Sequence, residues 1–291
     1  MFKLPYPAMA AAALLLAAQS AWSGTPINEK RPLNANAKVS VNNIAGSIIV
    51  QAWDRNELSL TGELGEGSEK LEITGDAASL NIVVKLPKHS HNAEDSLLQL
   101  RVPTGASLDL QAVSADIRVQ GVRGAISVNT VSGDVNLDVA SAQINAQTVS
   151  GDVHLRAAAT KTRINSVSGD VTIGGASGDL KGESVSGNVD VEGGPFSELK
   201  LHAVSGDVHI SGGLTDKGSM AVESLSGDIV LRLPGTPSAA LVMKTFSGDL
   251  SSDFGSSSGS DHNIETRLGD GKGSISLSSF SGDIDVRRDR H

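Results

Sequence analysis

The tripeptide Ser-Gly-Asp recurs along this chain and places a hydroxyl group beside a carboxylate, two groups that hydrolytic enzymes use together. A serine nucleophile needs one activated hydroxyl with a base in reach. Here the same serine recurs with no matching His or Lys, at Ser132, Ser150, Ser168, Ser186, Ser205, Ser226, Ser247 and Ser281. Gly adopts a positive φ without penalty, and Asp hydrogen-bonds nearby backbone. We therefore interpret the tripeptide as a turn and predict no catalytic residue.

The carboxylates of the same tripeptide form a second candidate site, for calcium. They are Asp116, Asp134, Asp152, Asp170, Asp207, Asp228, Asp249 and Asp283, with Asn188 in the place of one of them. If the copies stack, neighbouring carboxylates repel by roughly 1 kcal/mol in water, and a calcium ion would relieve that repulsion. However, Asn188 keeps the hydrogen bond without the charge, and the glycine-rich calcium nonapeptide is absent. We predict no metal and no cofactor, with a calcium-bound Asp column as the alternative.

Glu183, His202, Glu223 and Lys244 share one outward position, three residues before the corner serine. They are the nearest approach to an acid–base or metal site in the sequence. The alternative interpretation is a solvated charge ladder, which a flat surface without a pocket favours. We predict at most a surface-binding patch at these four residues. In earlier copies the same position forms an expected amide ladder of Gln111, Asn129, Gln147 and Asn165.

Three other histidines are weaker candidates. His209 is expected to lie next to Asp190 beyond the corner, but further metal ligands are missing there. His89 and His91 lie in a predicted surface loop and could bind a metal by chance. The sequence has no phosphate-binding loop, zinc-finger spacing or kinase signature.

The elements that position these residues follow from the spacing of the corners. Successive Asp-type positions are 18, 18, 18, 18, 19, 21, 21 and 34 residues apart, which is typical of stacked repeats. Apolar residues alternate with polar ones inside each copy, and a period of two indicates strands. The inward set is expected to include Val149, Val167, Val204 and Phe280 together with Val171. Each copy is thus predicted to be a strand, a sharp corner and a second strand.

Two all-β architectures fit this unit. In a β-solenoid each copy is one coil of about 18–21 residues, and equivalent residues stack at the strand spacing. In an antiparallel β-meander each copy is a hairpin with a Gly-Asp turn. We favour the solenoid because near-identical residues form columns when coils stack, while the stretches "GGPFSE", "GGLTDKGS" and "LPGTPSAA" vary at one edge.

The chain divides into three predicted segments. Residues 1–23 have the layout of a secretory signal peptide, with an uncleaved anchor as the alternative. Residues 24–107 are expected to be a β-rich segment that contains a first coil, "VSVNNIAGSIIV", and a cap. Residues 108–291 form the Ser-Gly-Asp repeat region, and the final "RRDRH" is expected to protect the last strand edge.

Composition limits the function classes. The formal net charge is -9 and aromatic residues make up 3% of the chain. The negative charge argues against nucleic-acid binding and against anionic lipid surfaces, so we expect membrane contact only through the signal peptide. The absence of Cys excludes disulfides, thiol chemistry and lipoprotein anchoring. The core must consist mainly of Val, Ile, Leu and Ala.

Several longer stretches resemble a known family. They are "INEKRPL" at 27–33, "QAWDRNELSLTG" at 51–62, "RVPTGASLDLQAVSADIRVQGVRG" at 101–124 and the serial "VSGDV" corners. They are similar to a bacterial family of exported β-strand-repeat proteins, catalogued as "putative adhesins" with a domain of unknown function. The resemblance covers nearly all of the chain after the signal. It implies a β-helical or β-roll fold and supplies no catalytic residues.

These observations favour an exported, non-enzymatic structural or binding protein, adhesin-like, in the periplasm, secreted or at the cell surface. Its expected partner is an envelope polysaccharide, an envelope protein or a second copy of itself. The enzyme alternative is a polysaccharide lyase or hydrolase on a β-helix, for which Glu183, His202, Glu223 and Lys244 are the available groups. A third hypothesis, an envelope-stress sensor, differs only in its partner.

Overall fold

The structure is a computed structural model that describes residues 24–87, 94–235, 237–255, 258–260 and 262–289. The predicted signal peptide and the loop histidines His89 and His91 lie outside the described residues. The all-β prediction is confirmed. The strands are β1 (Thr25–Pro32), β2 (Lys38–Trp53), β3 (Glu57–Leu64), β4 (Lys70–Gly75), β5 (Ser79–Lys85), β6 (Ser96–Pro103), β7 (Ser107–Gln120), β8 (Ile126–Ser132), β9 (Val135–Val139), β10 (Gln143–Ser150), β11 (Val153–Ala157), β12 (Lys161–Ser168), β13 (Val171–Ser186), β14 (Val189–Ser205), β15 (Val208–Ser226), β16 (Ile229–Leu233), β17 (Ala239–Ser247), β18 (Leu250–Ser252), β19 (Ser258–Ser260), β20 (Asn263–Leu268), β21 (Gly273–Ser281) and β22 (Ile284–Arg288).

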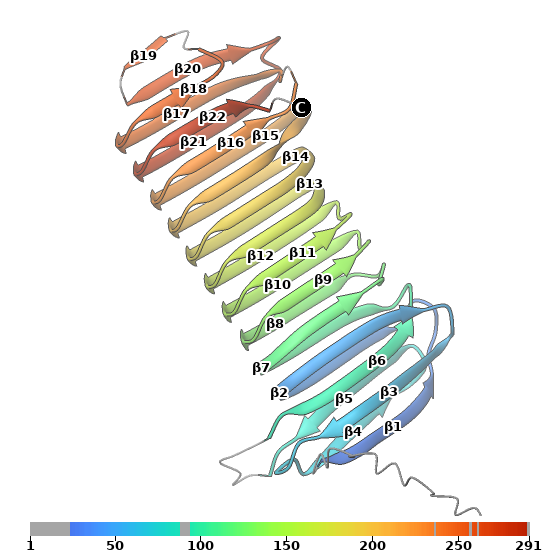
Figure 1. Cartoon of the computed structure of the whole chain (residues 1–291). Helices are drawn as coiled ribbons and strands as arrows, with labels where there is room; N and C mark the ends of the chain where they lie inside the picture. Colours follow the sequence, from blue (N-terminus) through green and yellow to red (C-terminus); the bar gives the residue numbers. More distant parts are fainter. Residues whose placement is uncertain (1–23, 88–93, 236, 256–257, 261, 290–291) are drawn as a thin grey trace, which may run out of the picture.

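The copies pair in parallel and in register. Gln147 lies opposite Asn129 on one side and Asn165 on the other, and Val153 lies opposite Val135 and Val171. Equivalent residues therefore form columns along an elongated stack (Figure 1). An antiparallel meander is wrong for this region. Among the described residues, antiparallel pairs lie near the two ends, between β1, β3 and β6, between β4 and β5, and among β17, β19 and β20.

Each copy contributes to two ladders of strands, one before and one after its corner. The ladder before the corner runs through β5, β2, β7, β8, β10, β12, β13, β14 and β15. The ladder after the corner runs through β6, β2, β7, β9, β11, β13, β14, β15 and β16. Inward side chains of both ladders form one continuous aliphatic core cluster. The outward side chains of each ladder are left as long, regular surfaces.

The order of the last copies differs from the order in the chain. Strand β21 lies between β15 and β17, and β22 lies between β16 and β18. The last repeat thus lies inside the stack. The prediction that "RRDRH" protects the final edge is wrong for Arg287 and Arg288, which belong to β22 and pair with Arg232 and Leu233 of β16. The reason lies in the long spacing before the last corner, because this segment forms β20, which covers the outer edge of β17. Residues 290 and 291 lie outside the described residues.

Candidate binding surface

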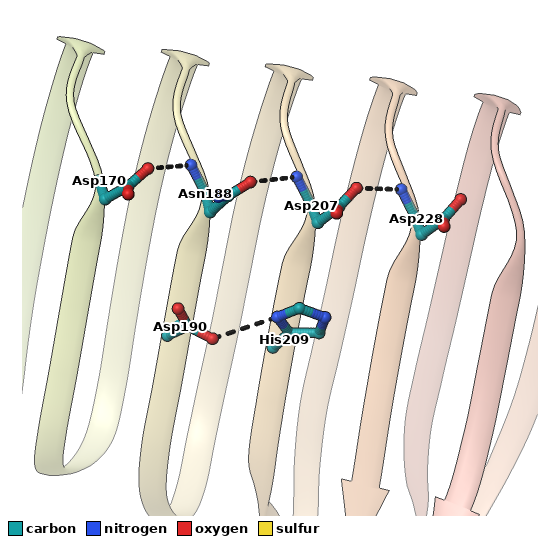
Figure 2. Close-up of polar contacts among 6 residues, drawn as sticks. All are labelled: Asp170, Asn188, Asp190, Asp207, His209 and Asp228. Carbon is teal, nitrogen blue, oxygen red and sulfur yellow. Dashed lines mark hydrogen bonds and ion pairs between the residues drawn. The ribbon is translucent and has the colours of Figure 1, made fainter.

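The corner column joins each copy to the next. A side-chain oxygen of each Asp-type residue accepts a hydrogen bond from the backbone N–H of the equivalent residue in the adjacent copy. The donor–acceptor distance is 3.0 Å from Asp152 to Asp134 and 2.9 Å from Asp170 to Asp152. Asn188 takes the same role toward Asp207 at 3.0 Å (Figure 2). The corner is therefore a hydrogen-bonding device, but the accepted bond comes from the neighbouring copy and not from the residue's own turn.

The alternative interpretation of the corner column, a calcium-bound Asp column, requires several ligands around one ion. In the described ranges, no group of three or more His, Asp or Glu side chains could hold a metal ion. One oxygen of each corner carboxylate is already used by a backbone donor, and the column runs as a line along the stack. Asp283 stands between Asp228 and Asp249, as the order of the strands requires.

The corner glycines have a positive φ, a backbone conformation that residues with a side chain rarely adopt. Gly151 has a φ of 115°, and a Cβ built there would lie 2.3 Å from the backbone oxygen of Gly133. Ala115 takes the glycine position of an earlier corner, and no non-glycine residue in the described segments has a positive φ. The corner of Ala115 is thus relaxed and not strained.

We expect Gly151→Ala to destabilise the chain by about 2–3 kcal/mol, because both the positive φ and the contact with the adjacent copy oppose a side chain. Urea unfolding followed by circular dichroism measures this change. The matched control is Ser150→Ala, at an exposed neighbouring position, which should shift the midpoint very little. Equal losses in the two variants would contradict the assigned corner geometry.

The structure brings together three of the four predicted surface-site residues. Glu183 lies opposite His202 in the register, and the Nδ1 atom of His202 is 3.2 Å from an Oε atom of Glu223. Lys244 is separated from Glu223 by Ser278, because β21 lies between their strands. The His202 and Glu223 side chains are 52% and 63% exposed. The column is therefore a solvated charge ladder on an open surface, without the burial that tunes an acid–base pair.

The predicted His209–Asp190 neighbours do meet, on the ladder after the corner, with Nδ1 3.2 Å from Oδ1 (Figure 2). They line a shallow hollow of about 820 Å³ that also includes His154, Arg156 and Asp138. The hollow is lined by both acidic and basic side chains, and the side chains of His209 and Asp190 are about half exposed. It provides a polar contact on an open surface, and the described residues offer no group of ligands for a metal ion there.

The strongest shift of an acid's pKa lies outside the predicted sites. The ammonium nitrogens of Lys181 and Lys200 are 2.8 and 2.5 Å from the Glu198 carboxylate oxygens. Hydrogen bonds from Lys181 and then Lys200 lower the pKa of Glu198 to about 2. This carboxylate therefore stays ionised at physiological pH, which suits a structural ion-pair cluster and not a general acid.

An exposed apolar column stands beside the corner, where the sequence pattern predicts buried residues. Val149 and Val167 are 47% and 46% exposed, Val204 is 45% and Phe280 is 54% exposed, so their predicted inward placement is wrong. The inward alternation continues instead to the residue before each of them, such as the buried Thr148. The inner side of the tight corner holds only small side chains there, namely Ala112, Thr130, Thr148, Ser166, Ser184, Ala203, Ser224, Ser279 and Thr245.

We call this column the apolar row. In the order of the stack it consists of Val113, Val131, Val149, Val167, Val185, Val204, Leu225, Phe280 and Phe246. The rings of Phe280 and Phe246 stack with centroids 4.9 Å apart and planes 5° from parallel. The two phenylalanines are neighbours because β21 adjoins β17. The sequence signal of the row is a Val, Leu or Phe that follows a small residue (Ala, Ser or Thr) and directly precedes each corner serine.

A row of amides runs parallel to the apolar row. It comprises Asn42, Gln111, Asn129, Gln147 and Asn165, and the two rows line a shallow groove of about 690 Å³. The expected hydrogen-bonded amide ladder is largely wrong. Only Asn42 and Gln111 contact each other, at 3.4 Å, whereas Asn129, Gln147 and Asn165 form no side-chain hydrogen bond to any described residue.

Comparison with known proteins places this geometry in context. The Toastrack DUF4097 family model matches residues 34–287. A "putative lipid binding protein" from Parabacteroides distasonis ATCC 8503 is 13% identical, with 91% of this chain and 98% of that chain covered and a TM-score of 0.52. A "putative adhesin" from Bacteroides fragilis NCTC 9343 is 12% identical, with 91% and 97% covered and a TM-score of 0.44. No curated protein matches the chain. At these identities the structural likeness concerns the fold alone.

Proposed function

Because the chain belongs to the Toastrack DUF4097 family, we propose that it is an exported, non-enzymatic binding protein of the bacterial cell envelope. The proposed molecule is a β-solenoid in which residues 24–107 supply the cap and a first coil, and residues 108–291 supply the repeats. The observation that carries the proposal is the apolar row, in which every member is at least 45% exposed. Contiguous exposed apolar surface on a soluble protein is typical of interaction sites.

The edge strands β1 and β4 of the N-terminal segment are poor sites for a partner, which favours the side surface. Strand β1 has Pro26 and Pro32, and its Glu29 pairs with Arg31. Strand β4 presents Lys70, which pairs with Glu72. Proline and charge on edge strands oppose the addition of another strand. The side surface, by contrast, offers one uninterrupted row across many copies.

The open charge ladder supports a binding role over the enzyme alternative. Glu183 lies only at the end of the shallow groove, the His202 and Glu223 side chains are 52% and 63% exposed, and Lys244 does not adjoin them. Glycoside hydrolysis needs two carboxyl groups that flank one bond in a defined geometry. None of the described segments forms a helix with the length and apolarity to traverse a bilayer. The leader pattern of residues 1–23 supports export.

Substitution within the apolar row tests this function. Purified chain is added to isolated cell envelopes of the bacterium that encodes it, and the fraction that sediments with them is measured. We expect Val149→Ser with Val167→Ser to lower this fraction about tenfold, since half-exposed valines would lose apolar contact with the partner. The control changes Asn136 and Thr172, outward residues on the other ladder, to Ala. Unchanged sedimentation of the valine variant would refute the proposal.

A further inference from the structure

We propose that the groove between the apolar row and the amide row binds a neutral, unbranched glycan that lies along the stack. This inference rests on the proposed binding function and names its ligand class. The groove spans the copies from Asn42 to Val185, and its residues come from consecutive paired strands. A linear site of this kind fits a linear polymer in extended form.

The amide row has unused hydrogen-bonding capacity. Its members alternate between Asn and Gln, so neighbouring side chains differ in length by one methylene, and of the described row members only Asn42 and Gln111 are within hydrogen-bond distance, at 3.4 Å. Asn129, Gln147 and Asn165 consequently keep donors and acceptors that no described residue uses. A hydroxyl group both donates and accepts, and each amide does the same. A polyhydroxyl chain therefore matches the row at every copy.

The apolar wall complements the other side of such a chain. Val131, Val149 and Val167 are each about half exposed, and all three line the groove. β-Branched side chains have few rotamers, so they lose little freedom when a ligand covers them. Extended β-1,4-linked pyranoses have equatorial hydroxyls at the ring edges and C–H groups on the ring faces. The hydroxyls would meet the amides, and the C–H faces would meet the valines.

The charge of the groove and of the whole chain favours a neutral glycan over an acidic one. From Asn42 to Asn165 the amide row carries no ionised side chain, and the chain as a whole has a net charge of -9. No Lys or Arg lines the groove, and the negative net charge of the chain opposes the approach of an acidic polysaccharide. Ionised groups on this column begin at Glu183, where the groove ends.

The repeat distance favours a glycan over an extended peptide. Parallel strands lie about 4.8 Å apart, which sets the period of both rows and is close to the length of one sugar ring in an extended chain. A peptide strand rises about 3.3 Å per residue, so side chains on one face recur at about 6.6 Å and fall out of step with the rows. A second copy of this chain shares the period, and association between copies is therefore one outcome of the test.

Calorimetric titration of the full chain tests the inference, with chitohexaose and cellohexaose as neutral probes and a galacturonic acid hexamer as the acidic probe. We expect saturable binding of a neutral probe and at least tenfold weaker binding of the acidic one. The triple variant Asn129→Ala, Gln147→Ala, Asn165→Ala should weaken binding at least tenfold. The control pair Asn136→Ala and Thr172→Ala should leave it unchanged, and circular dichroism checks that each variant is folded.

Three results would overturn the inference: no binding of either neutral probe, equal binding of the acidic probe, or equal losses in the amide and control variants. A fourth contradicting result would come from sedimentation velocity, namely a dimer of the unchanged chain that the triple amide variant no longer forms. The experiments distinguish a failure of the glycan assignment from a failure of the proposed envelope-binding function. Envelope binding that depends on Val149 and Val167, without glycan binding, would refute only the ligand assignment. Glycan binding without any effect of these valines on sedimentation would refute the proposed envelope role.

Discussion

Replacing Val171 with Asp is expected to unfold the copies around it, whereas Thr172→Asp is expected to leave stability nearly unchanged. Val171 is 3% exposed and lies between Val153 and Val189 in the core column. An unpaired carboxylate placed there costs at least about 4 kcal/mol. Thr172, the next residue, faces solvent on the same strand.

Urea unfolding of the two variants measures this contrast directly. The inward and outward positions differ by one residue, so the pair serves as its own control. A similar loss in both variants would contradict the assigned faces of the strand. A loss that is larger for Thr172→Asp would mean that the alternation is shifted by one residue.

Deleting residues 273–291 is expected to unfold β17 and β20 while the central copies remain folded. The deletion removes β21 and β22, and with them the strands that join β15 to β17 and β16 to β18. It also removes the buried residues Ile275, Leu277, Ile284 and Val286. Without this repeat the segment from β17 to β20 has no parallel partner, and a short antiparallel pair is not stable by itself.

Hydrogen exchange read by mass spectrometry tests this expectation. Peptides from Ala239–Ser247 should exchange as an unfolded chain in the truncated protein, and peptides from β10 to β12 should keep their protection. If the last repeat lay at the end of the stack, its removal would leave β17 protected. Retained protection of β17 would therefore contradict the interleaved order.

The spacing of the corners was enough to predict the columns of the repeat region. Each copy repeats the same alternation around Ser-Gly-Asp, so residues such as Asp134 and Asp152 must occupy equivalent places once the copies pair. The expected contact between His209 and Asp190 follows from the same register. Parallel pairing in register thus converts the sequence period into contacts across the stack.

Two features could not be read from the period. The position of β21 between β15 and β17 depends on which edge β20 covers, and every copy presents a similar edge. The period alone therefore predicts Lys244 beside Glu223, whereas Ser278 lies between them. The exposure of Val149 follows from the placement of Thr148, which is 4% exposed and takes the inward position at the corner. The hydrophobicity of Val149 predicts burial, but the smaller Thr148 occupies the interior at the corner.

The most direct test of the binding surface is a photo-crosslinking scan in cells. p-Benzoylphenylalanine is placed at Val131, Val149 and Val167 in the apolar row, and at His154 and Thr172 on the opposite ladder. We predict crosslinked products from the three row positions and none from the two control positions. Absence of products from the row, or products of equal yield from both ladders, would contradict the assignment of the row as the contact surface.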